Sequence, residues 1–161
     1  MQISKAMSEL INEQIAYEFS ASNQYLQFAT YFDSQALCKL SGFFYKQSEE
    51  EHQHALKFVQ YMTEVGGVVR IFEIPAAKYD NKSAEAVFQM SLDGEKEVTR
   101  RINAMMDLAI SEKDHATQAF LQWFVTEQVE EESSMGAMLQ VVQNAGQKNL
   151  LTVEAYMIHG G

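Results

Sequence analysis

Glu51 and His54 are three residues apart in a polar run in the first half of the chain. On a helix, this spacing places both side chains on one face, about one turn apart. A carboxylate and an imidazole that share a face can together bind a metal ion. Alternate steps of four and three from Glu51 reach residues that are apolar at both ends of the series, so this face is expected to point into a core. The series is Leu40, Phe44, Gln47, Glu51, His54, Phe58, Tyr61 and Val65.

Three other segments also have an apolar series with a carboxylate in its middle. They are residues 5–33 with Glu18, residues 83–111 with Glu95, and residues 114–145 with Glu131. The series in the second of these is Phe88, Leu92, Glu95, Thr99, Ile102, Met106 and Ala109. Because burial of a charge without a partner costs several kcal/mol, each of these carboxylates is expected to have a partner.

A bound metal ion is the partner that explains all of these positions together. A single buried histidine is more often hydrogen-bonded than metal-bound, and a run of glutamates such as 130–132 is more often a solvated face. Here, however, every long segment contributes a carboxylate, and four carboxylates in one core would repel each other strongly without a cation. Oxygen ligands with one imidazole suit iron or manganese better than zinc, which prefers Cys and His.

The elements that must position these residues are long helices, and the sequence predicts an all-α fold. Helices are predicted over residues 5–33, 37–65, 83–111 and 114–145, with a short fifth helix over 149–158. Ser4 and Ser83 are candidate N-caps, and Gly66-Gly67 and Gly146 are candidate helix ends. Residues 66–82 are predicted to form an extended crossover that runs the length of a four-helix bundle. The whole chain, 1–161, is predicted to be a single domain.

Composition narrows the classes of function. The net charge of −10 argues against nucleic acid as a partner, because phosphates require Lys and Arg patches. We find no apolar run long enough for a signal peptide or a membrane span, and we expect a cytoplasmic protein without a membrane partner. The single cysteine, Cys38, excludes an internal disulfide and is expected to be a small core residue.

The sequence resembles ferritins, and specifically bacterial non-haem ferritins, over nearly its whole length. The residues that carry the resemblance are Asn12-Glu13-Gln14, Glu18, Tyr25, Glu50-Glu51-His52-Gln53-His54-Ala55, Glu95, Phe120-Leu121-Gln122-Trp123-Phe124 and residues 127–132. The resemblance implies a ferritin-like four-helix bundle with a long crossover and a short C-terminal helix. It also implies a homo-oligomeric cage of 24 subunits that oxidises Fe(II) with O2 or H2O2 and stores an Fe(III) mineral.

The resemblance assigns a diiron ferroxidase centre inside each subunit. Glu18, Glu51 and His54 would hold one iron. Glu51 would bridge to a second iron held with Glu95 and Glu131.

The resemblance also implies a third iron site and two supporting residues. A set of glutamates matches the third site of bacterial members, namely Glu50, Glu127, Glu130 and Glu131. Gln128 matches a hydrogen-bonding group near the metals. Tyr25 matches a tyrosine beside the diiron centre, which could donate an electron or simply orient Glu95.

At two places the sequence differs from related ferritin families, and these differences argue against haem binding and against a carboxylate-lined pore. Haem-binding bacterioferritins have a methionine where this chain has His52, and a second histidine where it has Glu130, so no haem is expected. Animal ferritins have carboxylates in their threefold pores, at positions that match Gln118 and Leu121 here, so a pore of that kind is not supported.

Two other functions remain open from the sequence. The first is a diiron-carboxylate redox enzyme, an oxygenase or a peroxidase, without mineral storage. A peroxidase of the rubrerythrin kind would need paired cysteines, which one cysteine cannot supply. The second is an inert shell, against which the complete set of five core ligands argues.

Overall fold

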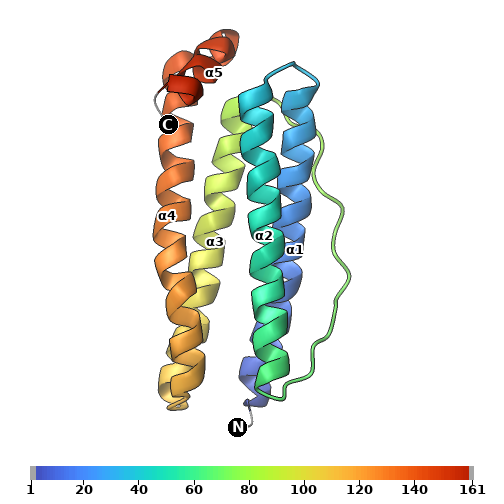
Figure 1. The fold of residues 1–161 in the computed structure, drawn as a ribbon, viewed down its shortest axis with the longest axis vertical. Helices are drawn as coiled ribbons and strands as arrows, with labels where there is room; N and C mark the ends of the chain where they lie inside the picture. The colour runs from blue at the N-terminus through green and yellow to red at the C-terminus, as the bar shows by residue number, and fades with distance from the viewer. Residues whose placement is uncertain (1–2, 160–161) are drawn as a thin grey trace.

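The computed structural model describes residues 3–159, and these form a bundle of four long helices with a short fifth helix across one end (Figure 1). The elements are α1 (Lys5–Asp33), α2 (Cys38–Glu64), α3 (Ala84–Ser111), α4 (His115–Ala145), a 3-10 turn (Gln147–Asn149) and α5 (Leu150–His159). The described residues contain no β-strand. The predicted fold class, a four-helix bundle with a long crossover and a short C-terminal helix, is confirmed.

The helix ends follow the sequence signals with small shifts. Ser4, Ser83 and Asp114 each accept a hydrogen bond from the backbone N–H three residues later, at 3.0–3.1 Å. Gly66 and Gly146 have φ of 72° and 76°, a conformation that favours glycine, and they follow the ends of α2 and α4. The second helix is one residue shorter at each end than the predicted 37–65, and the last begins as the 3-10 turn.

The connection between α2 and α3 is an extended strap that lies along α1 (Figure 1). Near its start, Asn12 donates to the carbonyl of Val68 at 3.0 Å and accepts from the N–H of Arg70 at 2.6 Å. Near its end, the Gln24 amide makes two hydrogen bonds with the backbone of Lys78, at 3.0 and 2.8 Å. These contacts hold the strap along the bundle, so that α3 runs in the same direction as α2.

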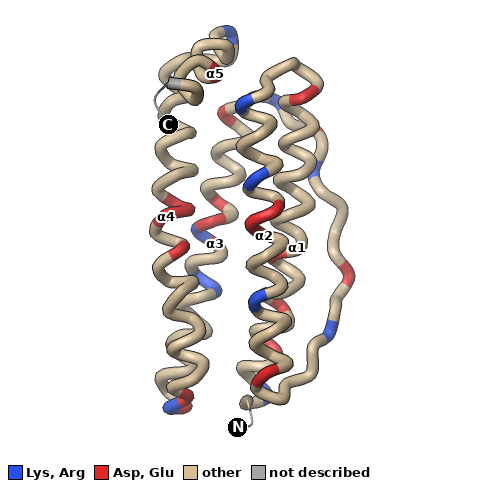
Figure 2. Tube along the Cα trace, viewed as in Figure 1, with Lys and Arg blue, Asp and Glu red and all other residues tan. Residues whose placement is uncertain are grey.

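Two apolar clusters fill the bundle, one towards each end. The cluster near α5 is aromatic and includes Phe28, Phe32, Phe44 and Phe88. The other includes Met7, Ile11, Ile15, Phe58, Met62, Ile102 and Phe124. The buried polar residues between the two clusters come from all four long helices, and acidic positions on α2, α3 and α4 lie midway along the bundle (Figure 2).

Two expectations about packing were wrong. On α3, the buried residues are Ala84, Val87, Phe88, Ser91, Glu95, Val98, Ile102, Met105 and Ala109, whereas Leu92, Thr99 and Met106 are half-buried. Both series have the same helical spacing, and only packing against neighbouring helices selects between them. Cys38 is exposed, because it is the first residue of α2 and the core side of that turn is occupied by Leu37 and Leu40.

Helix α5 is joined to the bundle by an unusual helix cap. Leu37, the N-cap of α2, makes no side-chain cap hydrogen bond. The Glu154 carboxylate instead accepts from the backbone N–H groups of Lys39 and Leu40, at 2.8 Å in each case. A carboxylate at a helix N-terminus satisfies free N–H groups and complements the helix dipole. The packing of α5 and the start of α2 therefore depend on each other.

Among the residues that the structure describes, no helix combines the length and the apolar character needed to cross a membrane.

Candidate metal centre

The core of the site is formed by two neighbouring helices, α1 and α2. Glu18, Glu51 and His54 are exposed by 0, 2 and 5%, and each offers a ligand atom within 4.8 Å of the other two. The His54 Nδ1 atom lies 3.2 Å from Glu51 Oε2. One turn before Glu18, the Gln14 amide donates to Glu18 Oε1 at 2.8 Å. These residues were predicted to share a core position, and the structure brings them together.

Two carboxylate oxygens in this group have no hydrogen-bond partner although they are buried. They are Glu18 Oε2 and Glu51 Oε1. A buried acceptor without a donor is costly, and most such atoms in folded proteins are paired. A cation bound between the two carboxylates would satisfy both oxygens, and oxygen ligands with one imidazole fit iron. The side chains present therefore fit a metal ion.

A second group of possible ligands lies between α2 and α4. His54, Glu127 and Glu131 have ligand atoms within 4.8 Å of one another. Glu131 is 5% exposed and Glu127 is half-buried. Because His54 belongs to both groups, the two positions are adjacent in the bundle.

Glu95 reaches the same polar layer from α3 and is held by two neighbours. The Tyr25 hydroxyl donates to Glu95 Oε1. The Gln128 amide donates to Glu95 Oε2 at 3.2 Å and to its backbone carbonyl at 3.1 Å. Both residues were predicted to lie beside the metal centre, and in the structure each binds the same carboxylate.

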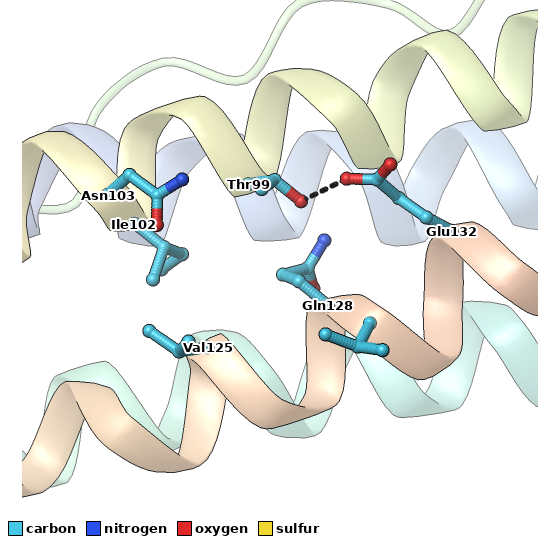
Figure 3. Close-up of a pocket in the computed structure, with 7 residues that line it drawn as sticks. Thr99, Ile102, Asn103, Val125, Gln128 and Glu132 are labelled. Atoms are coloured by element: carbon cyan, nitrogen blue, oxygen red, sulfur yellow. Dashed lines mark hydrogen bonds between the residues drawn. The ribbon is translucent and has the colours of Figure 1, made fainter.

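Gln128 also lies in the wall of a cavity of about 380 Å³ between α3 and α4. Figure 3 shows its amide nitrogen directed towards α3. At the same cavity, the Thr99 hydroxyl donates to Glu132 at 2.5 Å (Figure 3). Glu132 is therefore bound to α3 and does not join the buried group.

Burial raises the pKa values of all four core carboxyl groups, and repulsion between core carboxylates adds to it for Glu18, Glu51 and Glu131. Burial, followed by the charge of Glu51, raises the pKa of Glu18 well above its usual value. Burial, followed by the charge of Glu95, does the same for Glu51, and burial also raises the pKa of Glu95. Burial and the charges of Glu95 and Glu50 raise the pKa of Glu131 to about 8. Without a cation, this cluster therefore favours its protonated form.

No sequence pattern indicated how the side chains around His54 pack. The indole ring of Trp123 lies edge-on to the imidazole at 5.4 Å between centroids, and the Phe124 ring lies at 5.9 Å. Lys57 places its ammonium group 4.2 Å from the centroid of Trp123. Trp123 therefore restricts the orientation of the His54 ring, a possible ligand.

Two predicted members of the third iron site lie outside both groups. Glu130 is exposed, beside a shallow surface lined by residues such as Val129 and Ser133. Glu50 is half-buried, accepts from the Gln47 amide at 2.7 Å and lies 3.2 Å from the Lys46 ammonium group. On α4, residues 127 and 131 are one turn apart and both join His54, whereas residue 130 is exposed and belongs to neither group.

Comparisons with known proteins agree with this architecture. A family model described as a ferritin-like domain matches residues 8–145. The bacterial non-heme ferritin of Bacteroides fragilis is 32% identical over 155 residues, which cover 96% of this chain and 98% of the relative. That of Staphylococcus aureus is 35% identical over 144 residues, covering 89% of this chain and 87% of the relative.

A solved structure extends the match to the fold. An open pore ferritin from Archaeoglobus fulgidus superposes with a TM-score of 0.92 at 35% identity, covering 99% of this chain and 98% of that one. The match therefore includes the strap and α5 as well as the four long helices. With this agreement in sequence and in structure along almost its full length, the chain belongs to the ferritin family.

Proposed function

We propose that this protein is an iron-storage ferritin that oxidises Fe(II) at a diiron centre within each subunit. The observation that carries the proposal is the pair of buried, unpartnered oxygens of Glu18 and Glu51 beside His54. The similarity to bacterial non-heme ferritins supports iron as the metal. Iron is here the substrate and the cargo, and the protein supplies the ligands.

The proposed ligands are the five buried residues of the polar layer. Glu18, Glu51 and His54 hold one iron, and Glu95 and Glu131 hold the second, with Glu51 shared between them. The position of Glu51 within 4.8 Å of Glu18 and His54 supports it as the shared ligand, and the charges of Glu95 and Glu131 contribute to the raised pKa of Glu51. Tyr25 and Gln128 act as positioning residues that fix the orientation of Glu95.

The reaction follows from this ligand set. Carboxylates stabilise Fe(III), the harder ion, more than Fe(II), so binding favours the loss of an electron. Two Fe(II) ions each give up one electron, and O2 accepts both electrons with two protons to form H2O2. The pKa values of these carboxyl groups are raised, so Fe(II), which binds their ionised form, competes with protons for this site.

A third iron site has weaker support than the pair. Glu127 already lies with Glu131 and His54, so it is the best-supported additional ligand. Glu50 and Glu130 would both have to change their side-chain positions to contribute.

We also propose that the subunits assemble into a homo-oligomeric cage, with 24 subunits as the family suggests. Helix α5 leaves Leu151, Tyr156 and Ile158 exposed by 75, 46 and 57%, which is apolar surface available to neighbouring subunits. A cytoplasmic location and a shell without haem remain expectations from the sequence.

An oxidation assay tests the catalytic part of the proposal. Fe(II) mixed with the protein and O2 should form Fe(III) faster than Fe(II) in the same buffer. Equal rates with and without the protein would reject ferroxidase activity. Native mass and iron content then separate storage from a small diiron redox enzyme, because only a cage can retain many more than three irons per subunit.

A further inference from the structure

A second cavity, of about 220 Å³, lies between α1, α3 and the strap. It ends at the layer of buried polar residues that contains the proposed metal ligands. Tyr25 and Glu95, which are 4 and 2% exposed, form its inner end. Lys78 of the strap is exposed and lies at its outer rim. This cavity is separate from the one between α3 and α4, which reaches the layer through Gln128.

Most of the wall surface of the cavity between α1, α3 and the strap is apolar, with Ala21 and Phe28 from α1 and Met90 and Val98 from α3. The polar groups between them are neutral side chains, those of Tyr17, Ser20, Gln24 and Ser91. The strap is held over the cavity by the two hydrogen bonds between Gln24 and the Lys78 backbone. The rim is therefore a fixed part of the fold.

A glycine lines this space. Gly94 lies in the interior of α3, one residue before Glu95, and lines the cavity. Glycine in a helix interior is less stable than alanine. A Cβ atom at this position would have no atom within 4 Å, so no close approach of a neighbour demands glycine. The feature that a larger side chain would alter is the cavity itself.

The lining favours a small neutral molecule over a metal ion. Fe(II) would have to enter beside the cationic residue Lys78 and lose much of its hydration between largely apolar walls, which carry no carboxylate before Glu95, and this is unfavourable for a dication. Dioxygen is neutral and apolar, so neither feature opposes it. Its destination, the Tyr25–Glu95 pair, lies beside the proposed diiron site.

We propose that this cavity is the path by which O2 reaches the diiron site, separate from the path of Fe(II), and that Gly94 keeps it open. The inference rests on the proposed ferroxidase function. It assigns the cavity a ligand, dioxygen, and gives Gly94 a role in access rather than in metal binding.

The test fills the cavity from α3 and measures each substrate separately. Gly94→Leu should raise the KM for O2 roughly tenfold, with Gly94→Ala between it and the parent. The KM for Fe(II) and the anaerobic Fe(II) stoichiometry should not change. Gly42→Leu is the matched control, because Gly42 is an exposed helical glycine on α2 with no atom within 4 Å of a Cβ. It should behave as the parent.

Xenon supplies a readout that does not depend on activity. Apolar cavities bind xenon, so a crystal of the parent under xenon pressure should contain an atom between α1 and α3, and Gly94→Leu should remove it. A parent cavity without xenon, an unchanged KM for O2 in Gly94→Leu, or a rise in the KM for Fe(II) would each overturn the proposal. Failure of the parent to oxidise Fe(II) would instead reject the proposed function, while the xenon result would still report on the cavity.

Discussion

Two runs of three glutamates, residues 49–51 on α2 and residues 130–132 on α4, have the same composition but different environments. In the first run only the last member, Glu51, is buried, and in the second only the middle member, Glu131. The other members are exposed or half-buried, and several are held by neighbours outside the site. The phase of each helix, rather than residue type, therefore decides which carboxylate can bind metal.

The two buried members also differ from each other. Glu51 lies within 4.8 Å of Glu18 and His54 and has one oxygen without a partner. Glu131 shares His54 with the half-buried Glu127, so its surroundings are closer to solvent. The comparison predicts that loss of the Glu51 carboxylate slows Fe(II) oxidation most, and that substitutions closer to the protein surface have smaller effects.

The largest effect is expected for Glu51→Ala. This change removes the carboxylate shared by both proposed irons, so the initial rate of Fe(II) oxidation should fall roughly 100-fold or more. Stopped-flow measurement of Fe(III) formation checks it. Glu49→Ala is the matched control, because Glu49 is exposed and accepts only from Gln53 on its own helix. If both variants retained the parental rate, burial would not distinguish ligands from surface glutamates.

The second prediction concerns the pH dependence of stability without metal. The pKa of Glu131 is about 8 in the folded protein and lower in the unfolded chain, so the folded state binds the proton more tightly. This contribution is complete below the unfolded pKa and is lost as the pH rises towards 8. Glu131→Gln should therefore remove roughly 2–4 kcal/mol of the decline in stability between pH 5 and 8.

Thermal melts of the metal-free protein across this pH range measure the difference. Glu130→Gln changes the same kind of residue at an exposed position and should follow the parental pH profile. A Glu131→Gln profile that is parallel to the parent would show that Glu131 is ionised in the folded state, and that its burial does not control its charge.

The sequence predicted the buried polar layer well. Periodicity placed Glu18, Glu51, His54, Glu95 and Glu131 on core faces, and all five are buried. This succeeded because each helix is long and its apolar residues on both sides of the carboxylate define a face. On α3 the same method selected Leu92 and Thr99 in place of Ser91 and Val98. Two series with the same helical spacing pass through Glu95, and both contain enough apolar residues to form a core face.

Contacts between distant segments could not be predicted in this way. The hydrogen bonds between Asn12 and the strap, and those that Glu154 accepts from the start of α2, join residues 56–115 positions apart. No local pattern specifies such partners. The exposure of Glu130 also required the structure, because the resemblance grouped it with Glu127 and Glu131 by sequence position alone.

A smaller effect is expected for Tyr25→Phe. The ring would keep its contacts with Phe28 and Phe44, whereas the hydrogen bond to Glu95 would be lost. If this hydrogen bond orients the Glu95 carboxylate for metal binding, the oxidation rate should fall a few-fold, since loss of a positioning hydrogen bond costs about 1 kcal/mol. Stopped-flow rates at saturating Fe(II) measure it. A 100-fold loss would instead indicate that the phenol takes part in electron transfer.

The smallest effects are expected at the outer edge of α4, where Glu127→Ala and Glu130→Ala form a matched pair. Glu127 lies within reach of His54 and Glu131, whereas Glu130 is exposed and lies outside both groups. Neither residue belongs to the proposed pair of irons, so initial oxidation should change less than about twofold in both variants.

Anaerobic Fe(II) titration, followed by repeated aerobic additions, separates the two variants. Glu127→Ala should reduce binding beyond two irons per subunit and alter later turnover, while Glu130→Ala should match the parent in both. Equal losses in the two variants would mean that the Glu130 side chain swings inward when iron binds. In that case Glu130 would be exposed only in the metal-free protein. The rule that helix phase selects one glutamate of each run for metal binding would then hold only before iron binds.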